Sequence, residues 1–374
     1  MKLDYNMLDR IQQLTLALGG IFSSHGYSQY KMGKFEEYDL YSKNKDFLVS
    51  DSVITFTDTN GKLMALKPDV TLSIIKNTKN EQGIHKLFYN ENVYRVSKST
   101  NSFKEIMQSG VECIGDIDSF SIGEVLMLAA ESLNEISQDF ILEISQLDIL
   151  SKVIDRLELS GESRKALIKC VEEKNIHEIT AICTANAVSQ ADADIIKNLI
   201  SVSGKPDIVL PELRQMLKDM KLDDEITELE KAIEIFSSSE FKDKIIIDFS
   251  SVADFNYYNG IIFKGYINSV FGNVLSGGQY DKLMKKMKCA QKAVGFAVYL
   301  DMLDRIDLNS ESYDADIMLI YDSNALPSQV QKAISAFNKE GKSVLAVSKK
   351  QENKNCKQLY YLRDGEVKAF GTDA

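Results

Sequence analysis

Strand-like segments occur in two separate blocks of this sequence, and the stretch between them contains none. In the first block, two β-like runs meet at Asn60-Gly61, a strong signal for a tight hairpin turn. Residues 147–238 instead repeat charged, amphipathic helical patterns, and strand patterns return at residues 244–250. This order predicts an α+β fold in which a helical insertion divides a largely antiparallel sheet.

The same patterns predict four parts of the chain. We expect a first part of the sheet domain over residues 1–146, the helical insertion over 147–238, a second part of the sheet domain over 239–310, and a small C-terminal α/β unit over 311–374. The last unit has a strand, a helix, a strand and a hairpin signal at Asp364-Gly365.

Two helices of the sheet domain can be placed from the sequence. Hydrophobic residues at helical spacing predict a helix over residues 7–22. Ser121 and Glu124 have the spacing of a capping box, and apolar residues follow them at helical spacing. A second helix is therefore expected to begin at that box.

Composition limits the partners and cofactors. The chain has 44 Lys and Arg against 55 Asp and Glu, a net charge of −11, which argues against nucleic acid as the main partner because phosphate binding needs clustered cations. The five cysteines and three histidines are scattered, so we expect neither a disulfide framework nor a metal site, and no cofactor. The sequence shows no apolar leader and no apolar run of about 18 residues, which predicts a cytoplasmic protein without a signal peptide or membrane span.

Six short segments occur in the order found in one known enzyme family. They are LMALKPDVT (63–71), VYRVS (93–97), IMQSGVECIG (106–115), FNYYNGIIF (255–263), SGGQYDKL (276–283) and VGFAVYLDML (294–303). Together they resemble the motifs of the histidyl-tRNA synthetase branch of the class II aminoacyl-tRNA synthetases, over about residues 5–305. The resemblance implies a class II core, an antiparallel sheet flanked by helices, followed here by a shortened form of that family's C-terminal anticodon-binding domain.

Several positions depart from that family's catalytic pattern. An adenylating enzyme needs fixed cations around the ATP phosphates. By the resemblance, Ala253 replaces the arginine of R-G-L-D-Y-Y, and Met302 replaces the motif 3 arginine. Ser97 stands at the motif 2 glutamate, and Gln279 replaces the arginine of G-G-R-Y-D. We therefore expect that aminoacylation is lost and that the chain has no catalytic residue.

The resemblance also implies that the amino-acid side of the pocket is retained. A free histidine presents an ammonium, a carboxylate and an imidazole with two distinct nitrogens. The implied histidine-binding residues are Asp69, Thr71 and Gln108 for the ammonium, Glu112 and Tyr258 for the imidazole, Tyr257 beside them, and Arg95 for the carboxylate. Taken singly, each could be structural: Glu112 could lie on a solvated face, and paired tyrosines usually serve packing.

A synthetase-like core without adenylation chemistry, but with a histidine pocket, resembles the regulatory subunits of ATP phosphoribosyltransferase, the enzyme of the first step of histidine biosynthesis. This resemblance implies a non-catalytic chain that forms a homodimer, assembles with the short catalytic subunit into a hetero-octamer, and mediates feedback regulation by histidine. Two alternatives stay open. One is a divergent, active histidyl-tRNA synthetase, and the other is a synthetase-like paralogue that binds tRNA or another protein.

Overall fold

The computed structural model describes most of the chain. The described residues are 8–48, 53–78, 82–96, 102–251, 255, 257–305 and 313–370. They belong to two compact units, residues 1–306 and 307–374. Two of the positions that depart from the catalytic pattern, Ser97 and Ala253, lie outside the described residues.

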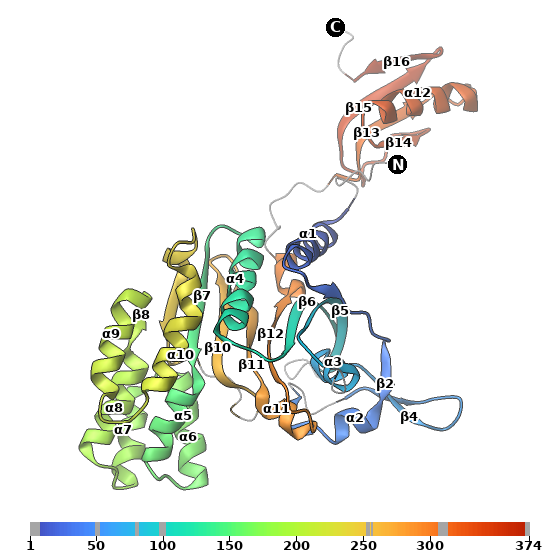
Figure 1. Ribbon diagram of the computed structural model, residues 1–374. Helices are drawn as coiled ribbons and strands as arrows, with labels where there is room; N and C mark the ends of the chain where they lie inside the picture. Colours follow the sequence, from blue (N-terminus) through green and yellow to red (C-terminus); the bar gives the residue numbers. More distant parts are fainter. Residues whose placement is uncertain are drawn as a thin grey trace. The chain divides into compact units, whose positions relative to one another are not determined.

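A nine-stranded sheet forms the centre of the first unit, in the order β1-β5-β6-β12-β11-β10-β7-β9-β8 (Figure 1). Its strands are β1 (Ser28–Gln29), β5 (His85–Val96), β6 (Phe103–Gly115), β7 (Phe140–Gln146), β8 (Ser203–Gly204), β9 (Ile245–Asp248), β10 (Asn259–Ile267), β11 (Asn273–Gln279) and β12 (Lys292–Tyr299). From β5 across to β7 every neighbouring pair is antiparallel. Strands from the two blocks of the sequence pair at β6–β12 and at β10–β7. The predicted α+β fold with a largely antiparallel sheet is confirmed.

Helices α1 (Arg10–Ser24) and α4 (Ser119–Ile136) cover one face of this sheet. Leu18 and Phe22 of α1 are fully buried, and Phe22 contacts Phe88 of β5 and Phe296 of β12. The sequence placed the first helix at residues 7–22. It begins at Arg10 because Asp9 forms a capping box with Gln12.

The predicted start of α4 is wrong by one turn. Asp118, not Ser121, is the N-cap: its carboxylate accepts from the backbone N–H of Ser121 at 2.8 Å. Ser121 already lies inside the helix, and its hydroxyl donates to the same carboxylate at 2.7 Å. Two residue types that both cap helices well stand three positions apart, and the extended backbone of Asp118 decides between them.

A run of helices lies between β7 and β9, where the sequence lost its strand patterns. It comprises α5 (Leu147–Arg156), α6 (Gly161–Glu172), α7 (Ile176–Ala185), α8 (Gln190–Ser201), α9 (Pro206–Leu217) and α10 (Asp223–Ile233). Short 3₁₀ turns follow at Glu234–Phe236 and Lys242–Lys244. Helix α10 packs against α4, so the helical segment shares the hydrophobic core of the sheet. The domain boundaries given above stay a prediction.

The opposite face of the sheet carries smaller elements. A three-stranded sheet has the order β2-β4-β3, with β2 (Phe35–Glu37), β3 (Thr55–Thr57) and β4 (Leu63–Leu66). The hairpin expected at Asn60-Gly61 joins β3 to β4, and Gly61 has a φ of 82°. Beside this sheet lie α2 (Tyr38–Ser42), the 3₁₀ turn Lys45–Phe47, α3 (Thr71–Thr78) and α11 (Asp281–Lys286).

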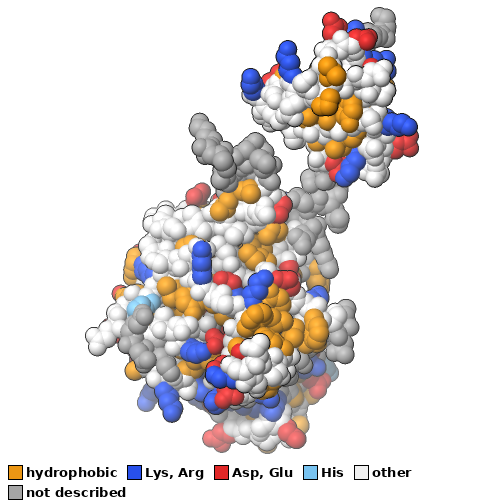
Figure 2. All heavy atoms as spheres, turned by 90° about the vertical axis from the view of Figure 1, so that its right-hand side faces the viewer, with side chains coloured by type: hydrophobic (Ala, Val, Ile, Leu, Met, Phe, Trp, Pro, Cys, Tyr) orange, Lys and Arg blue, Asp and Glu red, His pale blue; other side chains and the backbone are white. Residues whose placement is uncertain are grey.

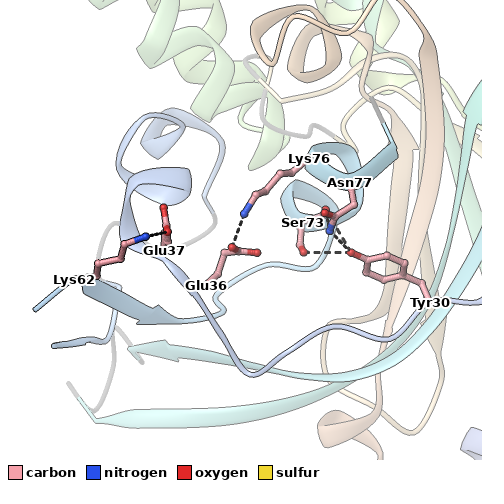
Figure 3. A network of polar contacts seen from close by, with 7 residues as sticks. All are labelled: Tyr30, Glu36, Glu37, Lys62, Ser73, Lys76 and Asn77. Carbon is pink, nitrogen blue, oxygen red and sulfur yellow. Dashed lines mark hydrogen bonds and ion pairs between the residues drawn. The ribbon is translucent and has the colours of Figure 1, made fainter. Parts of the chain in front are cut away.

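Polar contacts fix helix α3 against the neighbouring strands (Figure 3). Lys76 forms an ion pair with Glu36 of β2 at 2.6 Å. Asn77 donates to the hydroxyl of Tyr30 at 2.6 Å, and that hydroxyl lies 3.4 Å from the hydroxyl of Ser73. The first residue of α3, Thr71, is therefore held in place from both sides.

The outer face of the small sheet is apolar. The rings of Phe35 and Phe56 pack edge to face at 5.0 Å, yet Phe35 remains 56% exposed. Figure 2 shows hydrophobic side chains gathered over this sheet.

The second unit is a four-stranded sheet in the order β14-β13-β15-β16, with one helix. Its elements are β13 (Ala315–Tyr321), α12 (Pro327–Lys339), β14 (Val344–Val347), β15 (Cys356–Arg363) and β16 (Glu366–Ala369). Asp364 and Gly365 have φ values of 50° and 79°, which suits the tight hairpin predicted there. Across the described parts of both units, the helices are too short or too polar to cross a membrane.

We predict that Asp118→Ala lowers the free energy of unfolding by about 1 kcal/mol, because it removes the N-cap of α4. The control is Asp116→Ala, which removes an exposed carboxylate just before the helix. Urea unfolding followed by circular dichroism compares the two. Equal midpoints for both variants would contradict the assignment of Asp118 as the cap.

Candidate functional site

A cavity of about 390 Å³ opens on the face of the main sheet opposite α1 and α4. Alternate residues of β6 point to opposite faces, so Gln108 and Glu112 face the cavity while Val111 and Cys113 enter the core beneath α1 and α4. All seven residues of the implied histidine-binding set line it: Asp69, Thr71, Arg95, Gln108, Glu112, Tyr257 and Tyr258. Segments far apart in the sequence thus meet at one place, although their role in binding is still a prediction.

Glu112 lies at the buried end of this cavity. Its side chain is 3% exposed, which excludes the alternative that it sits on a solvated face. Thr71 donates its hydroxyl to one carboxyl oxygen at 2.7 Å, and Tyr280 donates to the other at 2.5 Å. Tyr280 was not among the predicted residues. The segment SGGQYDKL contains it, but only the fold shows that it reaches Glu112.

Burial raises the pKa of Glu112 to about 8, against the opposing effect of the hydrogen bonds from Tyr280 and Thr71. A carboxyl group with such a pKa is mostly protonated at neutral pH. It can accept from an N–H when ionised or donate to a bare ring nitrogen when protonated. Glu112 therefore suits a ligand that carries both kinds of nitrogen, as an imidazole does.

Glycine makes the space for this carboxyl group. Gly295 of β12 lies directly opposite Glu112 in the strand register. A Cβ atom at Gly295 would lie 2.0 Å from a carboxyl oxygen of Glu112, so a larger residue cannot be accommodated there. Gly278 of β11 likewise leaves space for Tyr258, because a Cβ atom at Gly278 would lie 2.9 Å from the tyrosine ring.

Asp69 and Arg95 lie at another part of the cavity wall. Asp69 accepts from the backbone N–H of Leu72 at 2.9 Å, in the first turn of α3. Burial raises the pKa of Asp69, while that hydrogen bond and the nearby Arg95 lower it. Arg95 donates through Nε to the carbonyl of Pro68 at 3.0 Å, which orients the guanidinium. Together they place one carboxylate and one cation within reach of a small zwitterion.

Aromatic rings form a further wall of the cavity. The rings of Tyr257 and Tyr258 lie 4.5 Å apart, and Tyr257 is 6.0 Å from the ring of Tyr280. Phe47 adds its ring at 6.2 Å from Tyr257, and Lys286 lies over the ring of Phe47 at 4.6 Å. This wall suits a flat ring that also carries polar atoms.

The positions linked to ATP chemistry look different. Met302, at the motif 3 arginine position, lies in the 3₁₀ turn Leu300–Arg305 and packs against the main hydrophobic core beside Gly272. Gln279 is 4% exposed and makes structural hydrogen bonds. Within the described residues, His, Cys, Asp and Glu side chains form no group of three that could hold a metal ion.

Comparison with known proteins bears directly on this site. The sequence model of the histidyl-tRNA synthetase family matches residues 3–303. The chain belongs to the histidyl-tRNA synthetase family. The expected resemblance is confirmed, since this family was predicted from the six motifs that surround the cavity.

Relatives within the family carry a more specific name. A protein of Clostridium acetobutylicum named ATP phosphoribosyltransferase regulatory subunit is 26% identical over 328 residues, or 85% of this chain and 80% of its own length. A protein of the same name from Bacillus cereus is 26% identical over 344 residues, covering 89% of this chain and 81% of that protein.

Solved structures share the fold. An ATP phosphoribosyltransferase regulatory subunit/histidyl-tRNA synthetase from Bacillus halodurans superposes with a TM-score of 0.77 at 21% identity, covering 94% of both chains. A histidyl-tRNA synthetase from Nostoc gives 0.73 at 16% identity, covering 92% of this chain and 83% of the other. A chain of the ATP phosphoribosyl transferase (HisG:HisZ) complex from Thermotoga maritima gives 0.61 at 20% identity, covering 78% of this chain and 97% of that one.

The buried carboxyl group predicts a pH effect on stability. The pKa of Glu112 is about 8 in the folded chain against an ordinary value of 4.5, so between these values the folded chain binds a proton that the unfolded chain has lost. Stability should therefore fall as the pH rises from about 5 to about 8. Glu112→Gln, which cannot titrate, should show a smaller fall.

Thermal unfolding at several pH values in this window tests the effect. The matched control is Glu105→Gln, an exposed carboxylate on the same strand, which should keep the wild-type slope. If the Glu112→Gln and wild-type slopes agree, the carboxyl group is already ionised in the folded chain.

Proposed function

We propose that this protein is a non-catalytic regulatory subunit of ATP phosphoribosyltransferase that binds histidine in the cavity around Glu112. The observation that carries the proposal is a contrast between two sets of motif positions. The seven residues of the implied amino-acid set line a single cavity, whereas the motif 3 position holds Met302, a partly buried apolar side chain that packs against the core.

The cavity suits histidine in its chemistry. Glu112 offers a buried carboxyl group for the imidazole, with Tyr258 beside it. Asp69 offers negative charge for the ammonium, and Arg95 offers positive charge for the carboxylate. Buried, oriented polar groups discriminate strongly against ligands that leave them unpaired. Such a set therefore selects one small amino acid.

The names of the relatives support the assignment to an ATP phosphoribosyltransferase regulatory subunit. We propose that the protein acts in the first step of histidine biosynthesis, in the cytoplasm. The solved complex of Thermotoga maritima supports a partnership with the catalytic subunit of ATP phosphoribosyltransferase. We further propose that this chain forms a homodimer within a hetero-octamer, with histidine as the effector. Exposed apolar side chains at Leu16 of α1 and Phe35 of β2, at 50% and 56%, favour pairing through this region.

Regulation follows if histidine binds one state of the complex better than another, because only differential affinity shifts an equilibrium. Such coupling is typically about 1–3 kcal/mol. The proposal therefore requires that the cavity change between states of the complex.

A divergent, active histidyl-tRNA synthetase is the main alternative. Among the described residues that line the cavity, the cations are Arg95 and Lys264, and Met302 cannot stack on or neutralise a nucleotide as an arginine would.

The purified chain is therefore expected to show no histidine-dependent exchange of pyrophosphate into ATP. Ala253→Arg alone should not restore it, because Met302 still removes the second cation. Measurable exchange by the unmodified chain would favour the synthetase.

Histidine affinity should depend on Glu112. Glu112→Gln keeps the shape of the side chain but removes the carboxyl group that can ionise when it accepts from a ligand N–H. Hydrogen bonds to charged groups are worth about 1.5–3 kcal/mol, so affinity should fall roughly 10- to 150-fold. Assembly with the catalytic subunit should persist, because the carboxyl group lies inside the fold and not on its surface.

Calorimetric titration of histidine into the wild-type and Glu112→Gln complexes measures this loss, with inhibition assays on the same samples. Glu105→Gln on the same strand again serves as the control. Equal binding and equal inhibition of all three complexes would place the histidine sensor elsewhere.

A further inference from the structure

The start of strand β10 is irregular where it meets β11. Asn259 pairs with Gln279 and Ile262 pairs with Gly278, so Gly260 and Ile261 are inserted opposite a single step of β11. Such a bulge redirects the chain and aims nearby side chains. Tyr257 and Tyr258 of the cavity stand immediately before it, so the conformation of the bulge sets the direction of the aromatic wall.

Side chains from other elements hold this bulge. The backbone N–H of Gly260 donates to the carboxylate of Asp148, in the first turn of α5, at 3.1 Å. The backbone N–H of Ile261 donates to the amide oxygen of Gln279 at 2.6 Å. Both N–H groups that the bulge removes from regular pairing thus have side-chain acceptors.

Gln279 continues this chain of hydrogen bonds into the helical segment. Its amide group donates to the carboxylate of Glu228 on α10. Glu228 also accepts from the amide of Gln146 at 2.7 Å, and the Gln146 oxygen accepts from the backbone N–H of Asp148 at 3.0 Å. The side chains of Gln279, Glu228, Gln146 and Asp148 and the backbone at the bulge therefore form a closed loop, called the Gln279 network below.

The fit at the bulge is tight. Gly260 has a φ of 57°, and a Cβ atom there would lie 2.2 Å from the amide oxygen of Gln279. The ring of Tyr258 lies close over Gly278, the residue next to Gln279 in β11. A shift of the Gln279 side chain therefore cannot leave the bulge, or the tyrosines before it, unchanged.

We propose that Gln279 is a positioning residue for the ligand cavity, which joins Tyr257 and Tyr258 to helix α10 through Glu228. The inference rests on the proposed function in one respect, the identity of the ligand as histidine. Displacement of α10 changes the affinity of the cavity. Since coupling between two sites is reciprocal, ligand binding also biases the position of α10. The helical segment is then the part of the chain through which occupancy of the cavity is transmitted.

Exchange of the two polar side chains tests the network. Gln279→Glu sets a carboxyl group at a buried position against the half-buried carboxylate of Glu228, and histidine affinity should fall roughly tenfold or more. The second variant combines Gln279→Glu with Glu228→Gln. The carboxylate introduced at position 279 accepts from the backbone N–H of Ile261 and from the amide introduced at position 228. The oxygen of that amide accepts from the amide of Gln146. The double variant should recover to within about threefold of the wild-type affinity. Glu230→Gln is the control, since Glu230 lies on the same helix but pairs with Arg214.

Measuring the effect of Gln279→Glu in a variant that lacks the Tyr258 ring separates a positioning role of Gln279 from a general effect on stability. If Gln279 acts through the aromatic wall, Gln279→Glu should have little further effect on histidine affinity once Tyr258 is replaced in Tyr258→Ala. A purely structural role would lower affinity by the same factor in both backgrounds. Wild-type affinity for Gln279→Glu, or failure of the double variant to recover, overturns the proposal.

Two further measurements test the proposal if Gln279→Glu does not fold or if the wild-type chain does not bind histidine. Should Gln279→Glu fail to fold, Glu228→Ala removes the carboxylate of α10 that accepts from Gln279 and Gln146, while the acceptors of the Gly260 and Ile261 N–H groups stay in place. It should still weaken binding several-fold, and unchanged affinity then rejects the coupling. Should the wild-type chain not bind histidine, the proposed function fails, and hydrogen exchange tests the network alone. Exchange at the Ile261 amide should then accelerate in Gln279→Glu and slow again in the double variant, and equal rates would reject it.

Discussion

The buried carboxyl group of Glu112 determines much of the surrounding structure. Burying a polar group of this kind is costly unless hydrogen bonds satisfy it, and here the hydroxyls of Thr71 and Tyr280 do so. Thr71 begins α3, Glu112 lies in β6, and Tyr280 follows β11, so one carboxyl group joins three elements that come together only in the tertiary fold. Gly295 on the neighbouring strand leaves the space for it. The ion pair of Lys76 with Glu36 holds α3, and so Thr71, in position from the other side.

The same fold can serve catalysis or recognition, and the difference lies in the charges around the cavity. Transfer of an adenylyl group requires cations that stabilise charge developing at phosphate. Recognition of an amino acid requires only that its charged and polar groups find partners. This chain has buried carboxyl groups and aromatic rings around the cavity, and a methionine at the position that the motif resemblance assigns to an arginine. The proposed function, binding without adenylation, is consistent with this set of side chains.

Regulation also needs a connection between the cavity and the rest of the chain. The segment that carries Tyr257 and Tyr258 leads into a bulge, which the Gln279 network ties to α5 and α10. Because hydrogen bonds are short-ranged and directional, such a network cannot follow a moving helix without changing the bulge. The cavity and the helical segment are therefore mechanically linked, even though the segment contributes no side chain to the cavity wall among the described residues.

The sequence by itself determined the fold class, the family and the residues gathered around the cavity, because alternating patterns, turn signals and motif order are local properties. It could not determine which of Asp118 and Ser121 caps α4, since both residue types cap well and only the backbone conformation selects one. Nor could it show that Tyr280 closes the hydrogen bonds of Glu112, or that Gln279 bridges a bulge to Glu228. Those contacts join residues separated by 168 and 51 positions, respectively. Only the tertiary structure decided these contacts. Pairing over such separations depends on strand register and on the space that glycines leave, and local sequence patterns specify neither.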